Sequence, residues 1–121
     1  MATQDFQTVF TELKSIMHTY EATMYVIADA PDNYVLDTQH LGPNGKRIFF
    51  GAVKTSKTYV SFHLMPVYMF PDLLDGISPE LHKHMQGKSC FNFKTADKAL
   101  FKELAVLTKK SVARMKQKNV L

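Results

Sequence analysis

The chain has 121 residues, of which 45% are hydrophobic and 21% charged. This length suits one domain, and this balance of residue types is typical of a globular protein and excludes a disordered tail. The net charge of +4 favours acidic partners only weakly, and the single cysteine, Cys90, excludes an internal disulfide. We therefore expect one domain over residues 1–121, in a reducing compartment.

Neither a membrane nor nucleic acid is an expected partner. Apolar segments stay well short of the roughly 20 residues that cross a bilayer, because Lys54, Lys57 and His63 interrupt the most apolar part of the chain. The first twenty residues lack the basic start and apolar middle of a secretory signal. Lysine and arginine are scattered, apart from a group in the last predicted helix. We expect a cytoplasmic protein.

The first half of the chain predicts one helix followed by four strands. Apolar residues recur every three or four positions over residues 6–20, which predicts an amphipathic helix. Strands are predicted at 24–28, 34–38, 48–54 and 58–64, and turn residues separate them. In the last of these, Val60, Phe62 and Leu64 alternate with more polar residues, so one face is core. Gly51 leaves a gap in side-chain cover or marks a bulge.

The second half predicts two short helices, a strand and a long helix. The short helices begin near Pro71 and after Ser78, and Gly87 is the predicted end of the second. A strand at 89–94 and a helix from about Asp97 close the chain. The short turns exclude crossover helices between the first four strands. The expected fold is α+β, a two-layer sandwich with a mainly antiparallel sheet of about five strands and the N- and C-terminal helices packed on it.

Residues 65–71 are unusually apolar for a connection between elements. They predict either a plug that covers the sheet or a functional surface. In the second interpretation, Tyr68 and Phe70 line a small pocket beside Tyr59 and His63, or form a surface that binds protein. The sequence leaves both interpretations open.

Cys90 has two interpretations, a nucleophile or a buried and inert cysteine. Lys88 is close to it in sequence, and a nearby cation lowers the pKa of a thiol. A nucleophilic role needs a base, and His63 is the one histidine in a predicted strand that could approach. The alternative is a buried, inert cysteine. No catalytic residue is assigned, and the predicted ligand-binding residues are Tyr59, His63, Tyr68, Phe70, Lys88 and Cys90.

Other motifs do not predict a site. The segment from Gly87 to Ser89 looks like the end of a phosphate-binding loop, but His82 stands where that loop needs a glycine, and a strand follows instead of a helix. No two histidines have the four-residue helical spacing of metal ligands, so a metal site would have to be assembled from distant segments. We predict no metal site from spacing.

Three segments carry a resemblance to a known family: the hairpin FFGAVKTSKTYVSFHLMP, the connection DLLDGISPEL, and MQGKSCFNF with its closing amphipathic helix. Together they resemble the YdhG-like family, small bacterial domains of unknown function, over residues 49–115. The resemblance implies an α/β sandwich compared with frataxin, and one member has been proposed as an iron chaperone. Iron carriers of this type need exposed carboxylates, whereas this chain is basic.

We therefore expect a noncatalytic binding or adaptor domain that uses its aromatic region for a small ligand or a protein partner. The alternatives are frataxin-like iron binding or delivery, and an unrecognised enzyme. The sequence assigns no cofactor, and it leaves a homodimer open.

Overall fold

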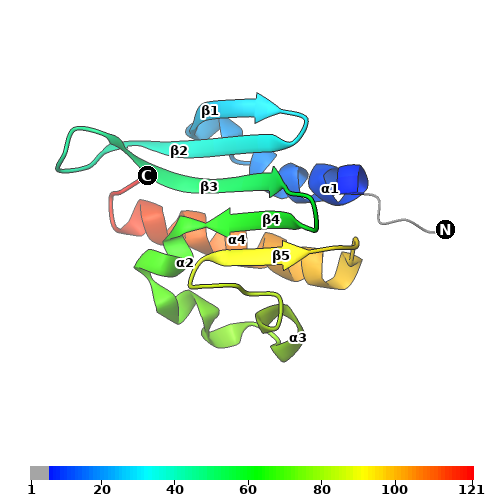
Figure 1. Ribbon diagram of the computed structural model, residues 1–121. Helices are drawn as coiled ribbons and strands as arrows, with labels where there is room; N and C mark the ends of the chain where they lie inside the picture. The colour runs from blue at the N-terminus through cyan, green and yellow to red at the C-terminus, as the bar shows by residue number, and fades with distance from the viewer. Residues whose placement is uncertain (1–5) are drawn as a thin grey trace.

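A computed structural model describes residues 6–121. Its elements are α1 (Phe6–His18), the short 3-10 helix η1 (Glu21–Thr23), β1 (Tyr25–Ala30), β2 (Asn33–Leu41), β3 (Arg47–Thr55), β4 (Val60–Leu64), α2 (Met65–Met69), a second 3-10 helix η2 (Pro71–Gly76), α3 (Pro79–His82), β5 (Cys90–Phe93) and α4 (Lys98–Gln117). The strands form one antiparallel sheet in the order β1-β2-β3-β4-β5 (Figure 1). The predicted α+β sandwich with its antiparallel sheet is confirmed.

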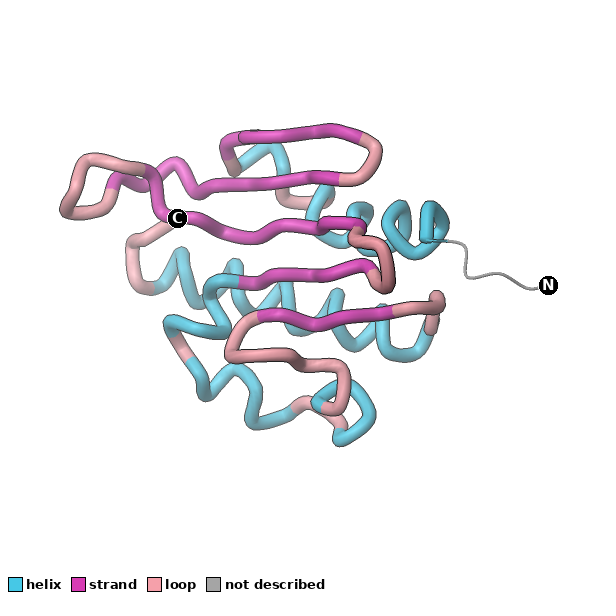
Figure 2. The backbone as a smooth tube through the Cα atoms, viewed as in Figure 1, coloured by secondary structure: helices cyan, strands magenta, loops and turns pink. Residues whose placement is uncertain are grey.

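The sheet has one covered and one uncovered face. α1 and α4 pack side by side on the same face, and within residues 6–121 no helix lies across the other (Figures 1 and 2). Phe62 and Phe91, which pair across β4 and β5, point to the helices and are fully buried. Side chains alternate along a strand, so their neighbours His63 and Cys90 point to the uncovered face.

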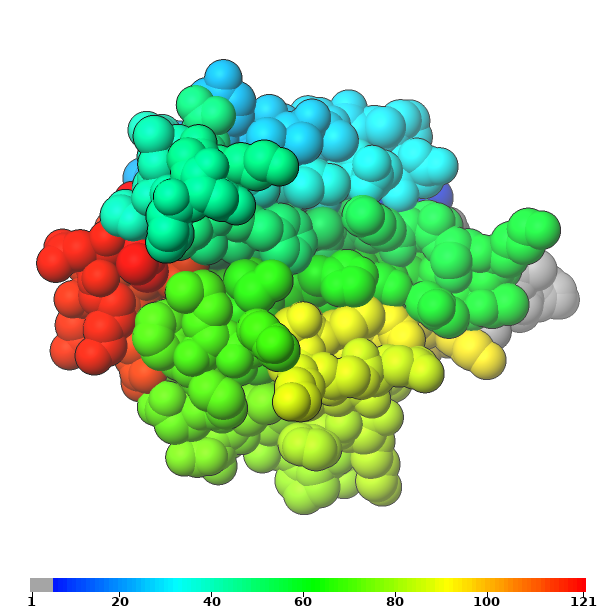
Figure 3. Space-filling view, turned by 60° about the vertical axis from the view of Figure 1, so that its left-hand side comes forward, coloured from blue at the N-terminus to red at the C-terminus, as the bar shows by residue number. Residues whose placement is uncertain are grey.

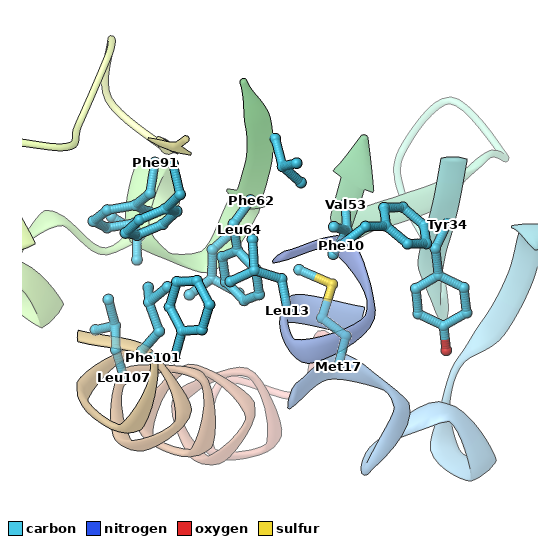
Figure 4. Packing of buried hydrophobic residues seen from close by; sticks show 14 of the residues in the cluster. Phe10, Leu13, Met17, Tyr34, Val53, Phe62, Leu64, Phe91, Phe101 and Leu107 are labelled. Atoms are coloured by element: carbon cyan, nitrogen blue, oxygen red, sulfur yellow. The ribbon is translucent and has the colours of Figure 1, made fainter. Parts of the chain in front are cut away.

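The core lies between the sheet and the two helices. α1 contributes Phe10, Leu13 and Met17, which meet residues of the sheet and of α4 in Figure 4. Asp97 caps α4, because its carboxylate accepts a hydrogen bond from the Leu100 amide at 3.0 Å. The last helix, α4, therefore begins directly after Asp97, as the sequence predicts.

Gly51 lets α1 approach the sheet closely. A Cβ at this position would lie 2.5 Å from Met17 Cε and 2.7 Å from the His63 carbonyl oxygen. The pairing of β2 with β3 also changes register between Leu36 and Asp37, next to Gly51. Both interpretations of this glycine, the side-chain gap and the bulge, therefore apply.

Three local predictions differ from the structure. Residues 65–69 form the helix α2. Pro66 lies in its first turn, where a backbone N–H would have no intrahelical acceptor, so proline breaks no hydrogen bond. The helix α3 ends at His82, well before Gly87, because the chain then turns back to pair Met85 with Phe91. β2 extends to Leu41 and includes His40, so His63 is not the only histidine on a strand.

None of the helices in the described part of the chain combines the length and the apolar character that crossing a membrane requires.

Candidate functional site

A cavity of about 510 Å³ lies between the α2–η2 segment and the loop that leads into β5. This volume is within the range of small-molecule sites. Its lining is mainly apolar, with a few polar side chains among apolar ones: Val67, Tyr68, Pro71, Leu74, His82, Met85, Gly87 and Lys88. In Figure 3 the α2–η2 segment, in green, and the loop before β5, in yellow, are adjacent on one surface. We call this space the α2–β5 cavity.

α2 places Tyr68 at the cavity. The helix starts directly after β4, and Val67 is buried in the core, which fixes how the helix sits on the sheet. Tyr68 is the next residue and is 54% exposed. Residues 65–71 are therefore both a plug and a surface: Pro66 and Val67 cover the core, and Tyr68 faces solvent.

Backbone hydrogen bonds hold the opposite wall. The Gln86 amide donates to the Cys90 carbonyl oxygen at 2.9 Å, and the Leu64 amide donates to the Ser89 carbonyl oxygen at 2.9 Å. Gly87 between them has a φ of 82°, which a glycine adopts without strain. Lys88 therefore projects from a loop whose backbone is fixed on both sides.

Side chains of α4 anchor the α2–η2 wall and α3. Arg114 donates two hydrogen bonds to the Asp72 carboxylate, at 3.0 and 2.7 Å, and its guanidinium lies 5.4 Å from the centre of the Phe70 ring. The Ser78 hydroxyl, which caps α3, donates to Glu103 at 2.7 Å. These contacts hold the cavity walls in place before a ligand arrives, which reduces the entropic cost of binding.

A second cluster lies on the uncovered face of the sheet, where His63 and Cys90 are directly paired residues of β4 and β5. The Cys90 Sγ is 3.8 Å from the His63 Nε2, and the thiol donates to the Asn92 Oδ1 at 3.2 Å. The Ser61 hydroxyl donates to the same Asn92 oxygen at 2.9 Å. His63 and Cys90 are both half-buried.

The environment keeps both members of this pair neutral. Burial lowers the pKa of His63, and the charge of Lys54 lowers it further. Burial raises the pKa of the Cys90 thiol, against a smaller opposing effect of a hydrogen bond with Ser61. A catalytic thiolate needs the opposite shift. Of the two interpretations of Cys90, the structure therefore favours the buried, inert cysteine over a thiolate activated by Lys88, which lies at the α2–β5 cavity.

The six predicted ligand-binding residues fall in separate places. Tyr68 and Lys88 meet at the α2–β5 cavity, and His63 and Cys90 meet on the uncovered sheet face. Tyr59 lines a different cavity of about 620 Å³, which we call the polar cavity because its other lining residues, Asn92 among them, are polar types. Phe70 lies against Arg114. The cavities at Tyr68 and at Tyr59 are therefore separate, and neither of them is lined by His63 or Phe70.

Sequence reasoning missed part of the cavity wall. Leu74 and Met85 read as core residues and His82 as a surface histidine, but all three line the cavity with Tyr68. No local sequence pattern marks these three residues, because the cavity forms only where the chain turns back after His82 and pairs Met85 with Phe91. Searches of protein-family models, of curated proteins and of solved structures found no match to this chain.

Proposed function

We propose that the protein is a noncatalytic binding domain whose α2–β5 cavity takes a small apolar molecule that carries an acidic group. The observation that carries this proposal is one cavity with apolar walls and a cationic side chain at its edge. Val67, Leu74 and Met85 supply apolar wall, Tyr68 supplies an aromatic face, and Lys88 supplies the positive charge.

The affinity should be modest. A ligand of about fourteen heavy atoms that gains about 0.3 to 0.5 kcal/mol per atom binds with a Kd of about 1 mM to 10 µM. Lys88 is exposed, so its contact with an anion remains partly screened by water and salt. The apolar walls therefore provide most of the affinity, and the charge provides the preference for acids.

A noncatalytic role is supported by the His63–Cys90 cluster, the one nucleophile–base pair that the sequence suggested. Because both groups are held neutral, the thiol keeps its proton at neutral pH. No specific observation favours the iron alternative over this one: residues 6–121 hold no group of three or more histidine, cysteine or acidic side chains arranged to bind a metal.

The proposal is tested by titrating the protein with 1-naphthylacetate, an aromatic carboxylate, and with the neutral 1-naphthylethanol, using isothermal calorimetry. We expect saturable binding of the acid and binding of the alcohol about five-fold to ten-fold weaker. Lys88→Met should weaken only the acid. Lys57→Met, which removes a lysine outside this cavity, should change neither.

Matched aromatic variants locate the site. Tyr68→Ala removes part of the cavity wall and should weaken both probes, whereas Tyr59→Ala alters the separate polar cavity and should leave both unchanged. Absence of saturable binding for both probes, or equal losses for the Tyr68 and Tyr59 variants, would contradict the proposal.

A further inference from the structure

We propose that His63 and Cys90 together bind one soft metal ion, Cu(I), on the uncovered face of the sheet. The sequence predicts no metal site from histidine spacing, because these two residues are 27 positions apart. The pairing of β4 with β5 brings them together. This site is independent of the α2–β5 cavity and of the proposed function.

The separation of the two side chains fits one shared ion. His63 and Cys90 are directly opposite on neighbouring antiparallel strands, so both project to the same face. Their Sγ and Nε2 atoms are 3.8 Å apart. In the near-linear arrangement of a two-coordinate ion, metal bonds of about 2.3 Å to sulfur and about 2.0 Å to nitrogen span about 4.3 Å, roughly 0.5 Å more than this gap. Small rotations of the two side chains supply the difference, so an ion can be bound without moving the strands.

The ligand set selects a soft ion of low coordination number. A thiolate and an imidazole suit Cu(I), whereas Ca²⁺ and Mg²⁺ need several oxygen ligands and structural Zn²⁺ takes four protein ligands. The described chain offers no third histidine, cysteine or acidic residue here. The Asn92 side-chain oxygen accepts hydrogen bonds from both Cys90 and Ser61, and an amide and a hydroxyl are poor ligands for Cu(I).

Charge favours the same ion. Binding replaces the Cys90 S–H bond with an S–Cu bond and releases one proton, while copper stays as Cu(I) and no electron is transferred. The thiolate and the ion then cancel each other's charge. A neutral complex suits this half-buried site. A divalent ion would leave a net positive charge there, which burial penalises.

The test is an anaerobic titration with Cu(I) in competition with bathocuproine disulfonate, followed by the absorbance of the chelator complex. Wild type should bind one Cu(I) per chain and release one proton per ion. Cys90→Ser should lower the affinity at least about 100-fold and His63→Gln at least about 10-fold. His18→Gln is the matched control, since His18 is an exposed residue of α1, and its affinity should equal that of wild type.

X-ray absorption on the wild-type copper complex provides a measurement that needs no variant. It should show one sulfur and one imidazole nitrogen bound to copper. The proposal is overturned if wild type does not compete for Cu(I), if Cys90→Ser or His63→Gln retains wild-type affinity in a folded protein, or if copper has no imidazole ligand. Saturation with Cu(I) should leave 1-naphthylacetate binding unchanged, so the two proposals fail separately.

Discussion

Replacing Gly51 with alanine should destabilise the protein by about 1 to 3 kcal/mol, the usual cost of forcing an extra carbon into a packed core. The new Cβ would lie 2.5 Å from Met17 Cε and 2.7 Å from the His63 carbonyl oxygen, both closer than real Cβ contacts. The end of the Met17 side chain can move, but the carbonyl belongs to the backbone of β4. Relief therefore requires β3 and β4 to shift.

Thermal unfolding followed by circular dichroism measures this effect. For a domain of this size, about 1 kcal/mol corresponds to about 4 °C in Tm, so the Gly51→Ala variant should melt about 4 to 12 °C below wild type. Gly76→Ala is the matched control, because a Cβ there would meet nothing within 4 Å and its φ is not positive. The control should melt at or slightly above the wild-type temperature.

A double-mutant cycle separates the two contacts. Met17→Ala removes the flexible neighbour, so Gly51→Ala should cost less in that background if Met17 causes part of the strain. A cost that persists is attributable to the His63 carbonyl. A Tm of the Gly51→Ala variant equal to that of the Gly76→Ala control would show that the extra carbon causes no strain.

Three further predictions concern titratable groups. Because the folded pKa of His63 is below its ordinary 6.5, unfolding is favoured as pH falls below 6.5. In urea unfolding, the free energy of unfolding of wild type should fall relative to that of His63→Gln between about pH 7.5 and about pH 5. A difference between the two free energies that does not change with pH would contradict this. Because burial raises the pKa of Cys90, iodoacetamide should label it at least about 10-fold more slowly than free cysteine at about pH 8, and labelling at the free rate would show an exposed thiol. The Arg114 hydrogen bond lowers the pKa of Asp72 from its ordinary 3.8. The Tm advantage of wild type over Asp72→Asn should therefore be complete above pH 3.8 and shrink as pH falls below it, and no change would indicate that the pair contributes nothing.

The overall fold was predictable because its signals are local. Val60, Phe62 and Leu64 alternate along β4, and this period of two both defines the strand and assigns its core face. α2 was not predictable in the same way. Its five residues form too short a segment to show a helical period, and Pro66 is compatible with a turn as well as with a first helical turn.

The candidate sites were only partly predictable, because they depend on contacts between distant segments. The pairing of β4 with β5 brings His63 to Cys90, an approach that the sequence allowed. The sequence left the direction of the Cys90 pKa shift open between a reactive and a buried cysteine, since the direction depends on burial and on where Lys88 lies. Tyr68 and Lys88 line the same cavity because the chain turns back after His82, at a loop where no periodic pattern exists.

The most direct test of the binding proposal is to map backbone amide chemical shifts of the protein by NMR during a titration with 1-naphthylacetate. Ligand in the α2–β5 cavity should move the amides of Tyr68, Leu74, Met85 and Lys88, which line it, and leave those of Tyr59 and Thr95 at the polar cavity unmoved. Shifts centred on the polar cavity, or no saturable shift at any amide, would contradict the proposal.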